Sequence, residues 1–459
     1  MRLRERLTPL LDHLEAGLIE RGRIVRLAFL AALAGEHTLL VGPPGTAKSE
    51  LARRLHLAFA GARYFERLLT RFTVPEELFG PLSISALEQD RYERITTGFL
   101  PQATIAFIDE VFKANSAILN ALLTLLNERE FDNGAGRERC PLVSVIGATN
   151  EVPADEVAEA FFDRFLMRLP VGPVSASDFR DLLELADGPL QAVPDALTDV
   201  DLAALQAAAA AVALPDEAAG LLAELRAMLA GERVYVSDRR WVKVAWLLKV
   251  AAASEGRAAV AIWDLWLLPW CVAPSLERQA AISAWLAGRL GLQASMAPPL
   301  LTRVVEAFEA QASLEQQAED LDYDDDGRLR FSPDIDSQVN DAKGAGQSMR
   351  MSYRRRRLYG DIHIAARVRQ IDELIERIAG YAEAIAARRA ELAAYTTQSI
   401  WLDRDFAAQA DANLAATDQS IATLRLRALA ARESFTALPR REVDTGQVPE
   451  PVAVAALPA

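Results

Sequence analysis

The chain has 459 residues, of which 51% are hydrophobic and 25% are charged. This composition excludes a disordered or collagen-like protein, and the length favours about three domains. The formal net charge of −14 disfavours nucleic acid as the main partner, because DNA and RNA are themselves polyanions.

Helices and strands alternate in the first third of the chain. Leucines that recur with helical spacing predict an amphipathic helix at the start, and a second helix is expected over residues 24–34. Short apolar runs at 37–41, 105–108 and 142–146 predict buried strands. A helix is expected near 116–127, between the second and third of these strands. Strands that alternate with helices predict a parallel sheet and therefore an α/β fold.

The segment after the first predicted strand nearly fits the P-loop pattern, in which glycines let backbone N–H groups close around phosphate oxygens. Its residues are Gly42, Pro43, Pro44, Gly45, Thr46, Ala47, Lys48 and Ser49. We expect Lys48 to reach the β- and γ-phosphates and Ser49 to give a hydroxyl to Mg²⁺. Ala47 stands where the pattern has glycine, and a methyl group is tolerated there if this residue is already helical. The segment therefore predicts a nucleotide site.

The second predicted strand ends in two neighbouring carboxylates, Asp109 and Glu110. This is the Walker B arrangement, in which Asp109 holds Mg²⁺ through water and Glu110 orients and deprotonates the attacking water. A solvated acidic turn is the alternative. Together with the P-loop, the pair favours an enzyme that hydrolyses ATP to ADP and phosphate.

The third predicted strand runs into residues 147–150 and ends at Asn150. In a parallel sheet this position lies beside the expected γ-phosphate, where the Asn150 amide would orient water. An ordinary asparagine in a turn is the alternative. The two site strands already assigned favour the water-orienting role.

The rest of the chain is predicted to be helical. After Pro170 the strand signal disappears, and segments rich in alanine and leucine continue to about residue 290. Three further helices are expected to pack as a bundle over 293–438, interrupted by a polar excursion at 319–357 whose role stays open. The tail at 439–459 is expected to be disordered.

These motifs resemble those of the AAA+ ATPases, specifically the MoxR group and, within it, the regulatory ATPase variant A (RavA) subfamily. Further matching segments are residues 74–80, 97–101, 162–165 and 236–241. The resemblance covers roughly residues 1–290. It implies a nucleotide-binding domain at 1–175, with hairpins inserted at 83–96 and 128–140, and an all-α lid domain at 176–292.

The resemblance also assigns roles to arginines. Arg164 is similar to the arginine finger that one subunit projects into its neighbour's nucleotide. Arg239 resembles a second sensor, which contacts the nucleotide of its own subunit, and Arg240 is the rival for that role. Nucleotide binding would then change the angle between the sheet and lid domains. Because a finger requires head-to-tail protomers, a ring is expected, with a hexamer as its family size.

The implied activity is that of a cytoplasmic, Mg²⁺-dependent ATPase that acts as a chaperone-like remodeller of a protein. A von Willebrand factor A-domain (vWA) protein is the expected partner. A lysine decarboxylase, which the RavA subfamily binds, is disfavoured because residues 319–357 are too short and polar to form the whole binding domain. The alternative is a DNA-linked motor or loader, or a metal-chelatase-like subunit. The candidate phosphate contacts for DNA are arginines of the inserted hairpins, namely Arg91, Arg94, Arg137 and Arg139.

Several classes of site are not predicted. Cys140 and Cys271 lie far apart, which excludes a disulfide framework and fits a reducing compartment. The four histidines are scattered singly, so no transition-metal site is expected. No apolar stretch is long enough to span a bilayer.

Overall fold

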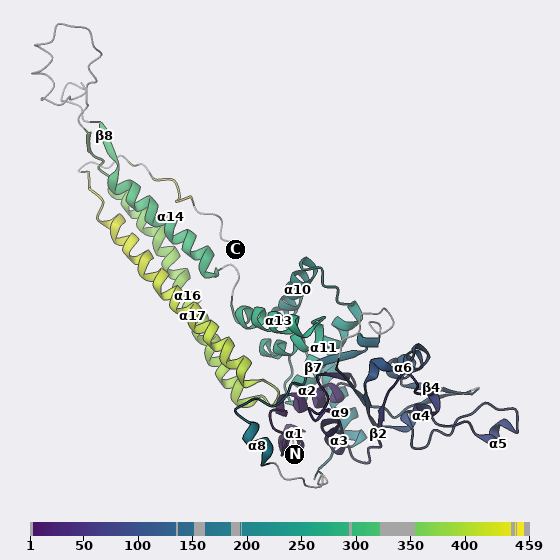
Figure 1. Cartoon of the computed structure of the whole chain (residues 1–459). Coiled ribbons are helices and arrows are strands. Elements are labelled where there is room, and N and C mark those ends of the chain that lie inside the picture. Colours follow the sequence, from purple (N-terminus) through teal and green to yellow (C-terminus); the bar gives the residue numbers. More distant parts are fainter. Residues whose placement is uncertain are drawn as a thin grey trace, which may run out of the picture. The chain divides into compact units, whose positions relative to one another are not determined.

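The computed structural model describes residues 3–134, 136–150, 161–184, 193, 195–292, 296–321, 354–441, 446 and 448–453. The chain divides into two compact units. The first unit is Met1–Leu290 together with Tyr395–Ala408, and the second is Gly291–Ala394 together with Gln409–Ala459. In Figure 1 the colours follow the sequence, so the first unit is mainly purple to teal and the second mainly green to yellow.

A parallel sheet forms the centre of the first unit. In the described part of the chain it has five strands in the order β2-β3-β6-β1-β7. Their bounds are β1 (His37–Val41), β2 (Tyr64–Leu68), β3 (Ile105–Asp109), β6 (Ser144–Thr149) and β7 (Phe165–Pro170). Because all strands run the same way, their carboxyl ends meet at one edge of the sheet, the carboxyl edge, and their amino ends at the other, the amino edge.

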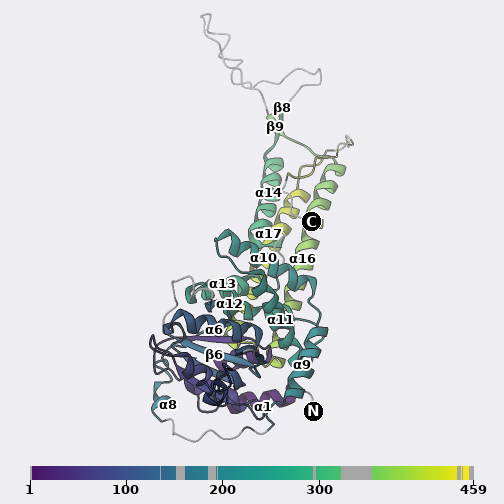
Figure 2. The ribbon, with the colours of Figure 1, turned by 90° about the vertical axis from the view of Figure 1, so that its right-hand side faces the viewer.

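The central strands are buried on both faces, as parallel strands between helices are. Leu39 and Val41, on one face of β1, share a core cluster with Leu122 of helix α6 (Ser116–Glu128). On the first unit's sheet, helix α2 (Gly22–Leu33) contacts β1, β6 and β7, and helix α3 (Lys48–Leu57) contacts β3. In Figure 2, α6 lies along one side of β6.

Strands β2 and β7 were not predicted, because neither has a simple apolar pattern. Strand β2 lies at the sheet edge and carries the charged Glu66 and Arg67. Strand β7 contains Arg168, whose charge is accommodated by buried hydrogen bonds rather than by solvent. The predicted third strand is present but begins and ends later than expected, as β6.

Two segments interrupt the α/β pattern where the resemblance placed hairpins. The second is a hairpin of β4 (Glu130–Asn133) and β5 (Gly136–Arg139). The first contains the short helix α5 (Ile84–Leu87) instead of two strands, and a bridge between Leu82 and Arg94 closes it. The segments are tied together by the Asn133 side chain, which accepts from Arg94 N–H at 2.6 Å and donates to the Arg94 carbonyl at 3.2 Å.

The remaining elements of the first unit are helical. Preceding the lid region are α1 (Leu3–Glu15), α4 (Pro75–Phe79), η1 (Leu100–Gln102) and η2 (Val111–Lys113). The lid region contains α8 (Phe179–Leu183), α9 (Asp199–Ala211), α10 (Asp216–Gly231), α11 (Asp238–Ser254), η3 (Ile262–Leu267), α12 (Leu268–Val272) and α13 (Leu276–Arg289). Residues 395–408 pack into this unit, where Trp401 Nε1 donates to Ser254 Oγ at 2.8 Å.

The second unit contains the predicted bundle. Its long helices are α14 (Pro298–Gln317), α16 (Asp361–Gln398) and α17 (Arg404–Thr436), which lie side by side in both views. Apolar side chains such as Phe308, Ile378 and Ile421 are buried along them. Most of the expected excursion at 319–357 lies outside the described residues, and its ends pair as β8 (Glu319–Leu321) and β9 (Arg354–Arg356).

Part of the tail that was expected to be disordered is placed against the second unit. Val452 is buried, and the Glu450 carbonyl accepts from Arg367 Nη1 at 2.6 Å. This anchoring explains why composition alone misjudged the segment. Among the described residues, no helix is both long and apolar enough to cross a membrane.

Candidate nucleotide-binding site

The P-loop leaves β1 at the carboxyl edge, beside the end of β7. A Cβ added to Gly42 would lie 2.0 Å from the Val171 carbonyl oxygen, so only glycine lets the loop start there. Gly45 and Ala47 have φ of 79° and 65°, and the chain turns through them into α3 at Lys48. Ala47 is therefore left-handed, so the helical conformation that would make its methyl group harmless is not the one it adopts, and the cost for an L-residue is about 1–2 kcal/mol.

Lys48 lies beneath this loop with 8% of its surface exposed. Its Nζ donates to the carbonyls of Gly42 at 2.7 Å and Pro43 at 2.9 Å. Burial lowers the pKa of Lys48, while the nearby charges of Asp109 and Glu110 act in the opposite direction. The structure thus brings together the P-loop lysine and both Walker B carboxylates.

Glu110 follows β3 in a strained conformation, with φ of 50°. Its N–H donates to Asp109 Oδ1 at 2.9 Å, which orients the first carboxylate, and its Oε1 lies 3.3 Å from Lys113 Nζ. Among the described residues, the buried Glu110 Oε2 has no hydrogen-bond partner. A buried acceptor left without a partner, on a strained residue, fits a position that binds a water molecule of a reaction.

The third element of the carboxyl edge also lies where it was predicted. Asn150 follows β6 and is exposed. Since β6 lies between β3 and β1, Asn150 stands between the strand of Asp109 and the strand that leads into the P-loop. The oxygen donors here, Asp109 and the half-buried Ser49 hydroxyl, are the hard ligands that Mg²⁺ prefers. The residues present at this edge therefore fit a magnesium nucleotide.

The sequence motifs missed one residue of this edge, Arg21. It precedes α2, is 6% exposed, and donates from Nη2 to the Gly172 carbonyl at 2.7 Å. A longer contact of 3.4 Å joins its Nε to the Thr46 carbonyl in the P-loop. Arg21 thus ties the P-loop to the segment after β7. No local pattern marks it, because both partners are distant backbone carbonyls.

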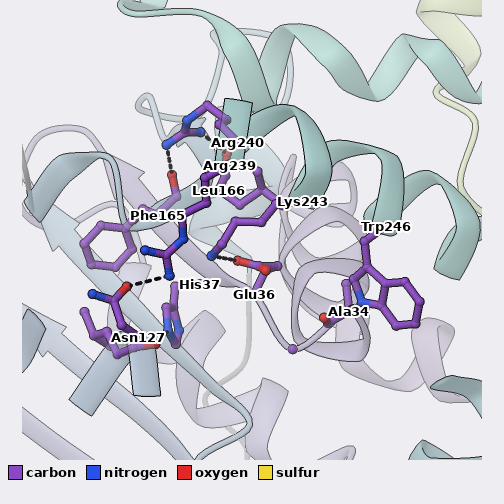
Figure 3. A network of polar contacts seen from close by, with 12 residues as sticks. Ala34, Glu36, His37, Asn127, Phe165, Leu166, Arg239, Arg240, Lys243 and Trp246 are labelled. Carbon is purple, nitrogen blue, oxygen red and sulfur yellow. Dashed lines mark hydrogen bonds and ion pairs between the residues drawn. The ribbon is translucent and has the colours of Figure 1, made fainter. Parts of the chain in front are cut away.

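Arg164 and Arg239 lie together, but at the amino edge. Arg164 directly precedes β7, and its buried Nε has no hydrogen-bond partner among the described residues. Burial lowers the pKa of Arg164, and the next largest cause is the like charge of Arg239. Arg239 is exposed on the first turn of α11 and donates to Asn127 Oδ1 at 3.1 Å (Figure 3). Arg164 therefore lies within the influence of two opposite charges, the Arg239 guanidinium and the Asp163 carboxylate.

The structure does not place Arg239 where the resemblance predicted. The first half of α11 is fixed to the amino edge, where Lys243 Nζ lies 2.5 Å from Glu36 Oε2 and Trp246 Nε1 donates to the Ala34 carbonyl at 3.1 Å. A five-residue strand spans about 16 Å, so Arg239 is separated from Lys48 of its own chain by roughly the length of β1. The sheet and lid domains were expected to close because Arg239 and the P-loop would contact the same nucleotide. With Arg239 at the amino edge, this reason for closure no longer applies.

Arg240, the rival candidate, is buried with 3% of its surface exposed. Its guanidinium bonds to Asp163 and to the backbone carbonyls of Phe165, Leu166 and Cys271. These partners occupy its donors, so Arg240 is not placed to contact a nucleotide.

Comparisons with known proteins match both parts of the first unit. Residues 5–189 match a family profile described as the MoxR domain in the MoxR-vWA-beta-propeller ternary systems. Residues 217–286 match the AAA lid domain. A solved structure of a protein from Cytophaga hutchinsonii, described as a candidate ATPase, is 18% identical with a TM-score of 0.50. It covers 61% of this chain and 90% of its own, and it supports the fold alone.

Several proteins are similar in sequence to part of the chain. Two uncharacterised proteins of Methanocaldococcus jannaschii are 40% and 42% identical over 265 and 248 residues. These matches cover 57% and 54% of this chain, and 69% and 65% of the relatives. Protein MoxR of Paracoccus denitrificans is 30% identical over 170 residues, which is 36% of this chain and 49% of that protein.

Proposed function

Since this chain belongs to the MoxR group of AAA+ ATPases, we propose that it hydrolyses ATP at a site completed by two protomers. The observation that carries the proposal is the placement of the two halves of the site. Lys48, Asp109 and Glu110 lie at the carboxyl edge, whereas Arg164 and Arg239 lie at the amino edge. One chain cannot bring both edges to one nucleotide, but two chains stacked head to tail can.

In the proposed reaction, Lys48 binds the β- and γ-phosphates, and Ser49 and Asp109 hold Mg²⁺. When bound, Mg²⁺ neutralises charge that develops on the phosphate oxygens. Glu110 accepts a proton from water as the water oxygen bonds to the γ-phosphorus and the bond from that phosphorus to the ADP oxygen breaks. Asn150 orients this water, and the adjacent protomer's Arg164 and Arg239 stabilise the charge on the transferred phosphoryl group.

Head-to-tail contacts that close generate a ring, and we propose a hexamer as its size. The second sensor is then Arg239 acting on the neighbour's nucleotide rather than on its own. This assignment is supported by its place beside Arg164 and by the buried bonds that occupy Arg240.

We propose that the ATPase remodels a protein, and that its partner carries a vWA domain in a cytoplasmic complex. The name of the matching profile supports this class of partner, since it describes a ternary system of MoxR, vWA and β-propeller proteins. The finer proposal of a RavA-like protein rests on the motifs within residues 1–290, and the helical second unit supports it by general architecture alone. No observation favours the DNA-linked alternative, because Arg91, Arg94 and Arg137 each pair with a carboxylate.

The direct test is phosphate release from ATP by the purified full chain, with and without Mg²⁺. We expect Mg²⁺-dependent turnover that Lys48→Ala abolishes together with nucleotide binding. The matched control is Lys249→Ala, which changes a lysine of the same charge on α11, away from the P-loop. Equal phosphate release by wild type and Lys48→Ala would overturn the proposal.

A further inference from the structure

Two neighbouring residue pairs, Asp163-Arg164 and Arg239-Arg240, meet at the amino edge. Arg239 is exposed and Arg164 is partly buried, whereas Asp163 and Arg240 form an ion pair with Arg240 Nε 2.9 Å from Asp163 Oδ1. Figure 3 shows Arg239 and Arg240 on the same turn of α11, with Arg240 directed at Phe165 and Leu166. The ion-paired residues, Asp163 and Arg240, are therefore adjacent in sequence to the arginines of the proposed reaction, Arg164 and Arg239.

The bonds of Arg240 enclose the backbone of Arg164. Its Nη2 donates to the Asp163 carbonyl at 2.9 Å and to the Phe165 carbonyl at 3.0 Å, which lie directly before and after Arg164. Its Nη1 donates to the Leu166 carbonyl at 3.1 Å and to the Cys271 carbonyl at 2.6 Å. With the bond to Asp163 Oδ1, all five N–H donors of the guanidinium have an acceptor.

This arrangement demands arginine. A lysine has a single nitrogen with three donors, and it cannot span acceptors on β7, on Asp163 and on α12. Breaking the pair would also leave the charge of the buried Arg240 without its carboxylate. Arg168 increases that demand, because its buried guanidinium lies over the Phe162 ring at 3.8 Å and shares Asp163 at 3.7 Å.

We propose that Arg240 is a positioning residue that fixes Arg164 and Arg239 as one two-guanidinium unit before protomers meet. The inference rests on the proposed function, in which this unit binds the phosphates of ATP held by an adjacent protomer. Arg240 fixes the backbone of Arg164 through the carbonyls on either side of Arg164. It fixes the backbone of Arg239 because Arg239 directly precedes it on α11, and Asn127 accepts a hydrogen bond from the Arg239 side chain. Donors oriented before binding lose little entropy in the transition state, which is where such groups have their largest effect.

The first test replaces Arg240 by lysine in the full chain. Misplacing a catalytic group by about 1 Å can cost roughly 10²-fold in rate, so we expect Arg240→Lys to lower kcat by about that factor. KM and the affinity for ADP should stay unchanged, because the P-loop is at the other edge. Arg257→Lys is the matched control, since Arg257 is a lid arginine paired with Asp264 at 2.7 Å away from this unit. Equal kcat losses in the two variants would overturn the positioning role.

The second test is a double-mutant cycle on binding of ADP with Mg²⁺ and aluminium fluoride, which mimics the transferred phosphoryl group. Arg240→Lys should weaken this binding in the otherwise wild-type chain, and have no further effect in an Arg164→Ala/Arg239→Ala chain. An equal loss in both backgrounds would show that Arg240 acts by another route.

The cycle also separates two kinds of failure. If the Arg164→Ala/Arg239→Ala chain itself turned over ATP like wild type, the proposed function would be at fault rather than the positioning role. If circular dichroism found Arg240→Lys unfolded, Asp163→Asn would take its place, since it keeps an oxygen acceptor and removes the charge. The same non-additivity is expected of it, and additive losses would contradict the inference.

Discussion

The two edges of the sheet are built in different ways. At the carboxyl edge, backbone conformation makes the site, because Gly45, Ala47 and Glu110 all have positive φ and turn the chain directly after a strand. At the amino edge, side chains from distant segments make it, because Arg164 and Arg239 are brought together by the packing of α11 against the sheet. The first half is local in sequence, and the second exists only in the folded chain.

This difference underlies the proposal that two protomers complete one site. In the proposed site, Lys48 comes from the carboxyl edge of one protomer and Arg164 comes from the amino edge of the next. The predictions below test each edge in turn.

The largest effect is expected at the amino edge. Arg164→Ala should lower kcat by about 10³- to 10⁵-fold, the range that arginine fingers contribute. ATP binding by the P-loop of the same chain should persist, which calorimetry can measure. The control is Arg180→Ala, which removes an exposed arginine that pairs with Glu184 four residues later. Loss of ATP binding in Arg164→Ala would place this arginine at its own nucleotide instead.

At the carboxyl edge, Glu110→Gln should lower kcat by about 10²- to 10⁴-fold, because it removes the general base. ATP affinity should remain, so the variant is expected to retain unhydrolysed ATP, as chromatography of the bound nucleotide would detect. Glu88→Gln changes an exposed carboxylate of the inserted segment and should leave turnover intact. Finding only ADP on Glu110→Gln would argue against its role as base.

Stability offers a second comparison of the edges. Gly42→Ala forces a Cβ against the Val171 carbonyl, and we expect it to lower the free energy of unfolding by about 1–3 kcal/mol, as overpacking does. Gly288→Ala is the control, because Gly288 is on α13 with no atom near its added Cβ, and alanine favours helix by about 1 kcal/mol. Urea denaturation should give changes of opposite sign, and a stable Gly42→Ala would contradict the close approach of β1 and β7.

At the amino edge, we expect a residue that makes the free energy of unfolding depend on pH, namely His37. Burial lowers the pKa of His37 well below its usual 6.5, and the charge of Arg129 adds to this. The unfolded chain therefore binds a proton below about pH 6.5 that the folded chain does not, so stability is lost as pH falls.

For this histidine alone, the slope approaches about 1.4 kcal/mol per pH unit. His37→Gln should flatten the pH dependence of the unfolding free energy between pH 5 and about 6.5. Unchanged slopes in wild type and variant would show that His37 is protonated in the folded chain.

The same division explains what could be predicted from sequence. The places of the P-loop, Asp109, Glu110 and Asn150 at strand ends could be predicted, because each directly follows an apolar run in the sequence. Strands β2 and β7 were missed because their charged residues break the apolar pattern. The position of Arg239 was not predictable from its motif, because it depends on the docking of α11 through Lys243 and Trp246.

Mixed assemblies of two inactive chains give the most direct test of a site shared between protomers. Lys48→Ala retains the arginines but no working P-loop, and Arg164→Ala retains the P-loop but no finger. In an equal mixture, about a quarter of the head-to-tail contacts would join an intact P-loop to an intact Arg164, so ATP turnover should reappear at up to that fraction of wild type. A mixture that assembles and yet stays as inactive as either parent would contradict the shared site.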